Sequence, residues 1–178
     1  MSDHRPTDAP GAAGAAPART DLLRIDDHPA AIAVTARIVA EARRALWIKS
    51  LDLEPWLFDH PEVLAALRAF ATSGREVQVR VLLHDAAAPQ AAHAMLLELA
   101  QRLPSVFQFR EVDDPVYRED RSAVLVNDAG GYYARAQGDA VAGSACLDGR
   151  ARARQLQQRF EEIWERSRPV AEYRALGL

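Results

Sequence analysis

Short apolar segments rich in β-branched residues alternate along this chain with amphipathic, helix-like segments. The strand-like segments cover residues 22–25, 45–49, 76–83, 106–112 and 123–126, and the helix-like ones cover 27–44, 59–74, 89–102 and 149–166. Strands that alternate with helices favour a sheet with helices packed on both faces. Residues 127–131, NDAGG, form a turn that leads into another strand-like segment and so predict a hairpin near the end. The sequence therefore predicts an open α/β fold with a mixed, largely parallel sheet.

The length and the first residues set the domain organisation. A chain of 178 residues fits one domain. Residues 1–20 are rich in alanine, glycine and proline, and such a segment cannot bury enough apolar surface to offset its ordering entropy. We therefore predict a disordered tail over 1–20 and one α/β domain over 21–178.

Composition argues against several classes of protein, although the uneven spread of charge leaves a local basic patch possible. The net charge of −3 argues against a strong field for nucleic acid or an anionic membrane. Cys146 is the lone cysteine, so no intrachain disulfide forms, and the scattered histidines provide no metal-ligand cluster. No secretory signal and no membrane-spanning run are apparent. We expect a cytoplasmic protein with no metal or cofactor.

The order of the predicted elements, and the stretch GSACLDGR at 143–150, resemble a known family. This stretch is similar to the Gly-Ser-x-Asn and Leu-Asp-x-Arg pieces that follow the catalytic motif of phospholipase D-type proteins. The resemblance covers about residues 22–168 and implies one phospholipase D-like repeat. It also implies a turn at the start of the last helix, where Ser144 and Arg150 would contact a phosphate group.

The catalytic motif of that family, His-x-Lys followed after four residues by Asp, is missing its first two members. The best frame places Asp128 at the aspartate, Arg121 at the histidine and Ala123 at the lysine. No histidine follows residue 93, and the one lysine of the chain, Lys49, lies far upstream. Since the family histidine attacks phosphorus, the resemblance implies a domain that is catalytically inactive.

A second resemblance concerns the partner. Residues 154–164, RQLQQRFEEIW, are similar to the closing helix of an uncharacterised group of proteobacterial domains found alone or fused to N-acetyltransferases. This resemblance implies a binding or regulatory role beside an acetyltransferase or another enzyme.

Five residues are candidates for a phosphate-like site: Ser144, Arg150, Arg121, Asp128 and His84. His84 follows a predicted strand at the carboxyl edge of the sheet, where open α/β sheets bind ligands. Arg121 and Arg150 offer forked donors to an anion. Each also has an ordinary interpretation, as a turn former or a partner in a surface ion pair, and the sequence leaves both open.

Three functions remain in view. The first is an inactive phospholipase D-like domain that binds a phosphorylated ligand or a protein partner. The second is a phosphodiester hydrolase with another nucleophile, taken from His84, Ser144 and Cys146. The third is a structural module that forms a homodimer, because active members of the fold bring two repeats together.

Overall fold

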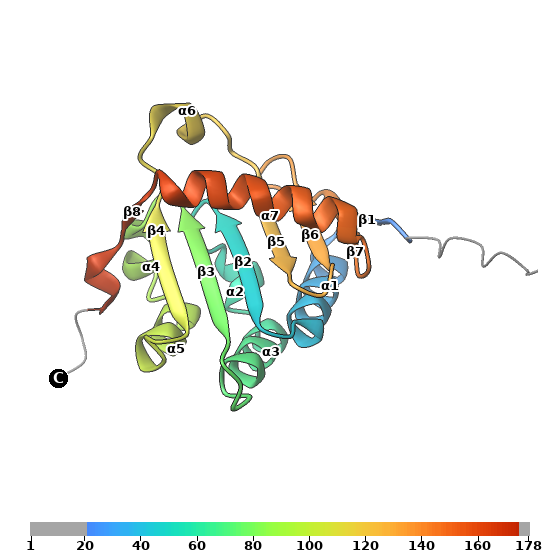
Figure 1. Ribbon diagram of the computed structural model, residues 1–178, viewed down its shortest axis with the longest axis horizontal. Coiled ribbons are helices and arrows are strands. Elements are labelled where there is room, and N and C mark those ends of the chain that lie inside the picture. The colour runs from blue at the N-terminus through green and yellow to red at the C-terminus, as the bar shows by residue number, and fades with distance from the viewer. Residues whose placement is uncertain (1–20, 175–178) are drawn as a thin grey trace, which may run out of the picture.

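The computed structural model describes residues 21–174, and within them eight strands form one sheet (Figure 1). The order across the sheet is β1-β7-β6-β5-β2-β3-β4-β8. The strands are β1 (Leu23–Ile25), β2 (Ala45–Ser50), β3 (Gln78–Leu83), β4 (Phe107–Glu111), β5 (Ala123–Asn127), β6 (Tyr132–Arg135), β7 (Gly143–Cys146) and β8 (Arg168–Pro169). The short edge strand predicted near residue 22 is confirmed as β1, whereas the predicted tail over 1–20 lies outside the described residues.

The sheet is mixed, as predicted, but the prediction that it is largely parallel is wrong. Of the seven pairings among the described strands, only β2–β3 and β3–β4 are parallel. The other five are antiparallel. The reason lies in the connections: β5, β6 and β7 follow one another without an intervening helix, and short connections join antiparallel neighbours.

Helices cover both faces of the sheet, as predicted (Figure 1). They are α1 (His28–Glu41), α2 (Pro55–Phe58), α3 (Pro61–Ala71), α4 (Ala87–Ala91), α5 (Met95–Arg102), α6 (Pro115–Arg118) and α7 (Arg150–Glu165), with a closing 3-10 turn, η1 (Ala171–Arg174). Helix α7 crosses one face, while α1, α3 and α5 lie on the other. None of the helices between residues 21 and 174 is long and apolar enough to span a bilayer.

The predicted helix over 89–102 is interrupted. His93 adopts a φ of 51°, in the left-handed region, and separates α4 from α5. The Asp59 carboxylate then accepts a hydrogen bond from the Leu96 N–H at 3.1 Å, in the first turn of α5. A side chain from the α2–α3 connection therefore helps to hold the start of α5, which no periodicity in 89–102 reveals.

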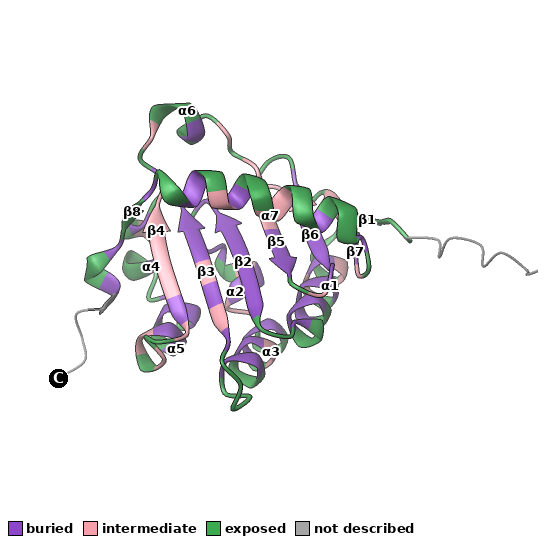
Figure 2. Cartoon of the chain, viewed as in Figure 1, coloured by how far each residue is buried: buried purple, intermediate pink, exposed green. Residues whose placement is uncertain are grey.

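Strand β2 is buried on both faces and divides the core into two layers (Figure 2). Leu46 and Ile48 belong to the layer with α1, α3 and α5, whereas Trp47 packs in the layer that contains Phe160 of α7. Because side chains alternate across a strand, the last two residues of β2, Lys49 and Ser50, also point to opposite faces.

Candidate functional site

Buried polar side chains gather at one end of the sheet, where the parallel strands β2 and β3 have their C-termini. We call this end of the strands one edge of the sheet, and their other end the opposite edge. Lys49 and Ser50 end β2, His84 follows β3, and Glu54 lies in the chain just after β2. Arg135 reaches the same edge at the end of β6, because it pairs in register with Ala123 at the start of β5. A buried polar group requires partners, so the partners of each group indicate its role.

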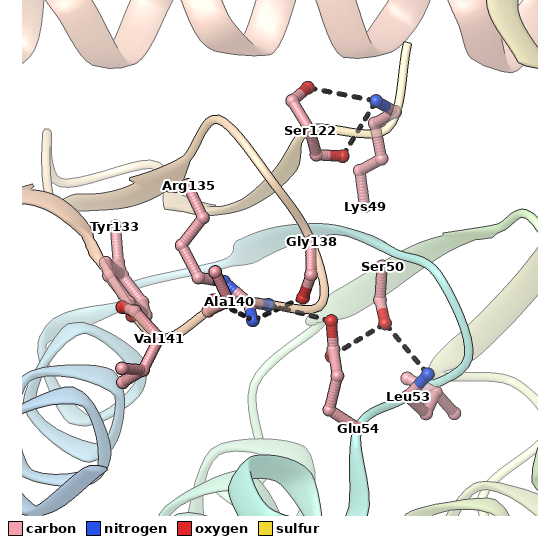
Figure 3. Close-up of polar contacts among 10 residues, drawn as sticks. All are labelled: Lys49, Ser50, Leu53, Glu54, Ser122, Tyr133, Arg135, Gly138, Ala140 and Val141. Atoms are coloured by element: carbon pink, nitrogen blue, oxygen red, sulfur yellow. Dashed lines mark hydrogen bonds and ion pairs between the residues drawn. The ribbon is translucent and has the colours of Figure 1, made fainter. Parts of the chain in front are cut away.

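Lys49 links β2 to the segment that precedes β5 (Figure 3). Its Nζ donates to the carbonyl oxygens of Asp120 at 2.8 Å and Ser122 at 2.9 Å, and it lies 3.2 Å from the Asp120 carboxylate. Burial lowers the pKa of Lys49, and the charge of Asp120 opposes that effect. Burial alone would raise the pKa of Asp120, but hydrogen bonds from Ser122 and the charge of Lys49 hold it below its ordinary value. These contacts occupy the ammonium donors of Lys49.

His84 lies close to Lys49 and Asp120, and its side chain is almost fully buried. Its Nε2 has no hydrogen-bond partner among the described residues. Burial, together with the positive charges of Lys49 and Arg121, lowers the pKa of His84 to about 4. The imidazole is therefore neutral at neutral pH and is a weak proton acceptor there.

A second cluster of polar side chains lies at the same edge, on the other face of the sheet (Figure 3). Arg135 forms an ion pair with Glu54 at 2.9 Å and donates to the carbonyl oxygens of Gly138 at 2.7 Å and Ala140 at 3.3 Å. Ser50 donates to the second carboxylate oxygen of Glu54 at 2.8 Å. Burial raises the pKa of Glu54, which Arg135 and Ser50 offset in part. The side chains of Arg135 and Glu54 are only 3% and 6% exposed, so this ion pair is part of the core.

Two of the five predicted site residues, His84 and Arg121, lie at this edge. Asp128 does not, since it follows the opposite end of β5. Its carboxylate accepts hydrogen bonds from the backbone N–H groups of Arg43 at 2.8 Å and Arg44 at 2.9 Å. Asp128 therefore holds the connection between α1 and β2.

Arg150 lies at that opposite edge together with Asp128. Both line a pocket of about 220 Å³ between the first turns of α7 and the β5–β6 turn. The other lining residues are Arg43, Asn127, Ala129, Gly130, Ala153, Arg154 and Gln157. Arg150 is largely exposed and pairs with Asp148 at 2.9 Å. The structure thus separates the predicted site into two places, one at each edge of the sheet.

Ser144 lies in neither place, and the predicted turn over 143–150 is wrong in its first half. Gly143–Cys146 is strand β7, because it pairs on one side with β1 and on the other with β6. Ser144 is half-buried opposite Ala134. Strand β7 stands four positions from β3, and strands lie ~4.8 Å apart, so Ser144 is about 19 Å from His84 across the sheet.

The buried ion pair between Glu54 and Arg135 was missed in the sequence analysis. The Glu54–Arg135 pair joins residues 81 positions apart, and its one sequence signal is an arginine at the end of the apolar strand 132–135. Arg43, which also lines the pocket around Arg150, carries no distinguishing local pattern.

The family of the chain follows from its sequence. Residues 27–176 match the model of a family described as Domain of unknown function (DUF7931). The chain belongs to this family. No curated protein matches the sequence.

Solved structures show that this DUF7931 domain has a phospholipase D-like fold. Nuc from Salmonella typhimurium, a phospholipase D family member, superposes with a TM-score of 0.54 at 13% identity, over 84% of this chain and 98% of Nuc. NucT from Helicobacter pylori gives a TM-score of 0.58 at 9% identity, over 84% of this chain and 97% of NucT. TrmBL2, an archaeal chromatin protein whose structure shows a mode of DNA binding, gives 0.60 at 12% identity. That match covers 89% of this chain but 56% of TrmBL2.

Proposed function

We propose that this DUF7931 domain is a phospholipase D-like domain that does not hydrolyse phosphodiesters and instead binds a phosphate-bearing ligand. The ligand site is the pocket lined by Arg43, Arg150 and Arg154. The binding serves a regulatory role beside another enzyme, of which an N-acetyltransferase is one candidate.

The observation that best supports the loss of hydrolysis is the buried ion pair between Arg135 and Glu54. In the frame of the phospholipase D motif, Arg121 and Ala123 stand at the histidine and lysine positions. Arg135 lies directly beside Ala123 in the sheet and is fixed there by Glu54 and by two carbonyl oxygens. These bonds orient its guanidinium group within the core, so it is not free to hold the oxygens of a phosphate.

The distances across the sheet also oppose a hydrolase with another nucleophile. A serine or cysteine nucleophile requires a base within hydrogen-bond reach, ~3 Å. Ser144 and Cys146 both lie on β7, four strands from His84. Cys146 is in addition almost fully buried.

The pocket between α7 and the β5–β6 turn has the chemistry of an anion site. Three arginines line it, and arginine forks match phosphate oxygens. One of its sides is formed by the first two turns of α7, and the helix dipole favours negative charge near this end of the helix. Asp128 is nearby, but two backbone N–H groups already neutralise part of its charge. A volume of about 220 Å³ suits a phosphate or diphosphate group rather than a whole dinucleotide.

A thermal-shift titration with inorganic phosphate, pyrophosphate and ADP tests the binding. A ligand at about a hundred times its Kd adds ~2.7 kcal/mol, which raises the Tm by about 5–10 °C in a domain of this size. We expect Arg150→Ala to abolish the shift and the matched control Arg75→Ala, an exposed arginine outside the pocket, to retain it. No shift with any of the three ligands, or an equal shift in Arg150→Ala, contradicts the proposed site.

A further inference from the structure

The outward side of α7 is exposed, and no other described element covers it (Figure 2). We call its residues the outer stripe: Ala151, Arg154, Gln158, Glu162 and Glu165, all of them exposed. The opposite side of α7 is buried and packs in the layer of Trp47. The outer stripe holds no large apolar side chain, so any partner that binds it must be recognised by charge and hydrogen bonding.

The charges of the outer stripe do not stabilise their own helix. Arg154 lies in the half of α7 near its N-terminus, and Glu162 and Glu165 lie near its C-terminus. The helix dipole favours the opposite order. Neither Arg154 nor Glu165 forms an ion pair with a described residue, and Glu162 pairs only with its exposed neighbour Arg159. The charge order is therefore unexplained by contacts within the domain.

The outer stripe is self-complementary about its central residue, Gln158. Arg154 lies four residues before Gln158 and Glu162 lies four residues after it. With a rise of ~1.5 Å per residue, the two charges stand about 6 Å from the centre on either side. If two such helices pack antiparallel around a twofold axis at Gln158, each Arg154 faces the Glu162 of the other helix.

We propose that the outer stripe of α7 is a contact between two copies of this chain, packed antiparallel around a twofold axis at Gln158. An isologous contact uses the same surface on both subunits, which the symmetric charge order satisfies. The contact is small and polar, so it is weak and concentration-dependent. It is also sensitive to salt, because its ion pairs are exposed. Arg154 also lines the phosphate pocket, whereas Glu162 does not, so a change at Glu162 tests the contact without altering a pocket residue.

Sedimentation velocity at increasing concentration and low ionic strength tests the proposal. The mass of the wild-type chain should rise from 19.6 kDa towards twice that value, and about 0.5 M salt should return it to the monomer. Glu162→Arg places two arginines opposite each other and should raise the dimer Kd by at least about tenfold. The control Glu76→Arg makes the same charge change at an exposed residue away from α7 and should dimerise like the wild type.

The double variant Arg154→Glu/Glu162→Arg reverses both charges and restores their complementarity, so it should dimerise again. Circular dichroism of each variant establishes that it is folded. A wild-type chain that stays monomeric at low salt overturns the proposal. So does a Glu162→Arg variant that dimerises like the wild type, or a folded double variant that remains monomeric. Among these variants only the double one changes a residue of the phosphate pocket, Arg154, and the titration of the Arg150→Ala variant tests the pocket separately.

Discussion

Replacing Arg135 with methionine should lower the free energy of unfolding more than almost any other single substitution at this edge of the sheet. Methionine keeps much of the volume but removes the charge and every donor of the guanidinium group. Glu54 then keeps its carboxylate in the core without its cation, and the carbonyl oxygens of Gly138 and Ala140 lose a charged donor. Three acceptors thus lose this donor, and two of the bonds lost, those to Glu54 and to Gly138, are buried.

The size of the effect follows from the burial of the pair. Removing one member of a buried ion pair costs about 3–5 kcal/mol, because the remaining charge is poorly solvated. Since Arg135 and Glu54 are only 3% and 6% exposed, solvent screening reduces this cost little. Globular domains have total stabilities of about 5–15 kcal/mol, so Arg135→Met should take a large part of the free energy of unfolding. Without Arg135, the pKa of Glu54 rises further, and the loss should shrink at acid pH, where Glu54 is protonated.

Urea unfolding followed by tryptophan fluorescence measures this loss, and the Trp56 ring lies 5.7 Å from the Arg135 guanidinium. With an m-value of about 2 kcal/mol/M, the midpoint at neutral pH should fall by about 2 M. Adding Glu54→Gln to the Arg135→Met variant removes the stranded charge and should recover about 1–2 kcal/mol. An Arg135→Met variant within about 1 kcal/mol of the wild type, or a double variant no more stable than the single one, would refute the reasoning.

Three further predictions concern the two sheet edges. The folded pKa of His84 is about 4, below its unfolded value of 6.5, so wild-type stability should be complete above pH 6.5 and fall towards pH 4. His84→Phe should lose that part of the pH dependence in urea unfolding. Asp128→Ala removes two backbone hydrogen bonds and should cost about 1–3 kcal/mol by the same assay. Gly130→Ala should lower the Tm, because Gly130 has a φ of 108° and an added Cβ would meet Arg150 Cγ at 2.6 Å.

Much of the fold is predictable from local patterns. The apolar periodicity of 29–44 and 149–166 predicts α1 and α7, and the β-branched run at 76–83 predicts β3. The Asp27-His28-Pro29 start of α1 is confirmed by the Asp27 carboxylate, which accepts from the Ala30 N–H at 2.8 Å. Strand direction is not predictable in this way, because whether β5 runs parallel or antiparallel to β2 depends on how the chain crosses the sheet. The sequence therefore predicts the elements better than their pairing.

The site is less predictable, because its contacts join distant parts of the chain. The resemblance of 143–150 to a phosphate-binding turn identified Arg150, which lines the pocket, but it placed Ser144 in a turn although Ser144 lies in β7. The alternation of polar and apolar residues in a strand predicts which side chains share a face, yet not which loop supplies their partners. The Glu54–Arg135 pair depends on such a loop, the segment after β2.

The most direct test of the proposed function is ³¹P NMR of the purified domain with ADP and bis(4-nitrophenyl) phosphate in one sample, in which ADP reports binding and the second compound reports phosphodiester hydrolysis. The account predicts that the diphosphate resonances shift or broaden as protein is added, that Arg150→Ala prevents this change, and that no product resonance appears. A product resonance that grows with time in the wild type and is absent in His84→Phe would contradict the account, because it would show that the domain is a hydrolase.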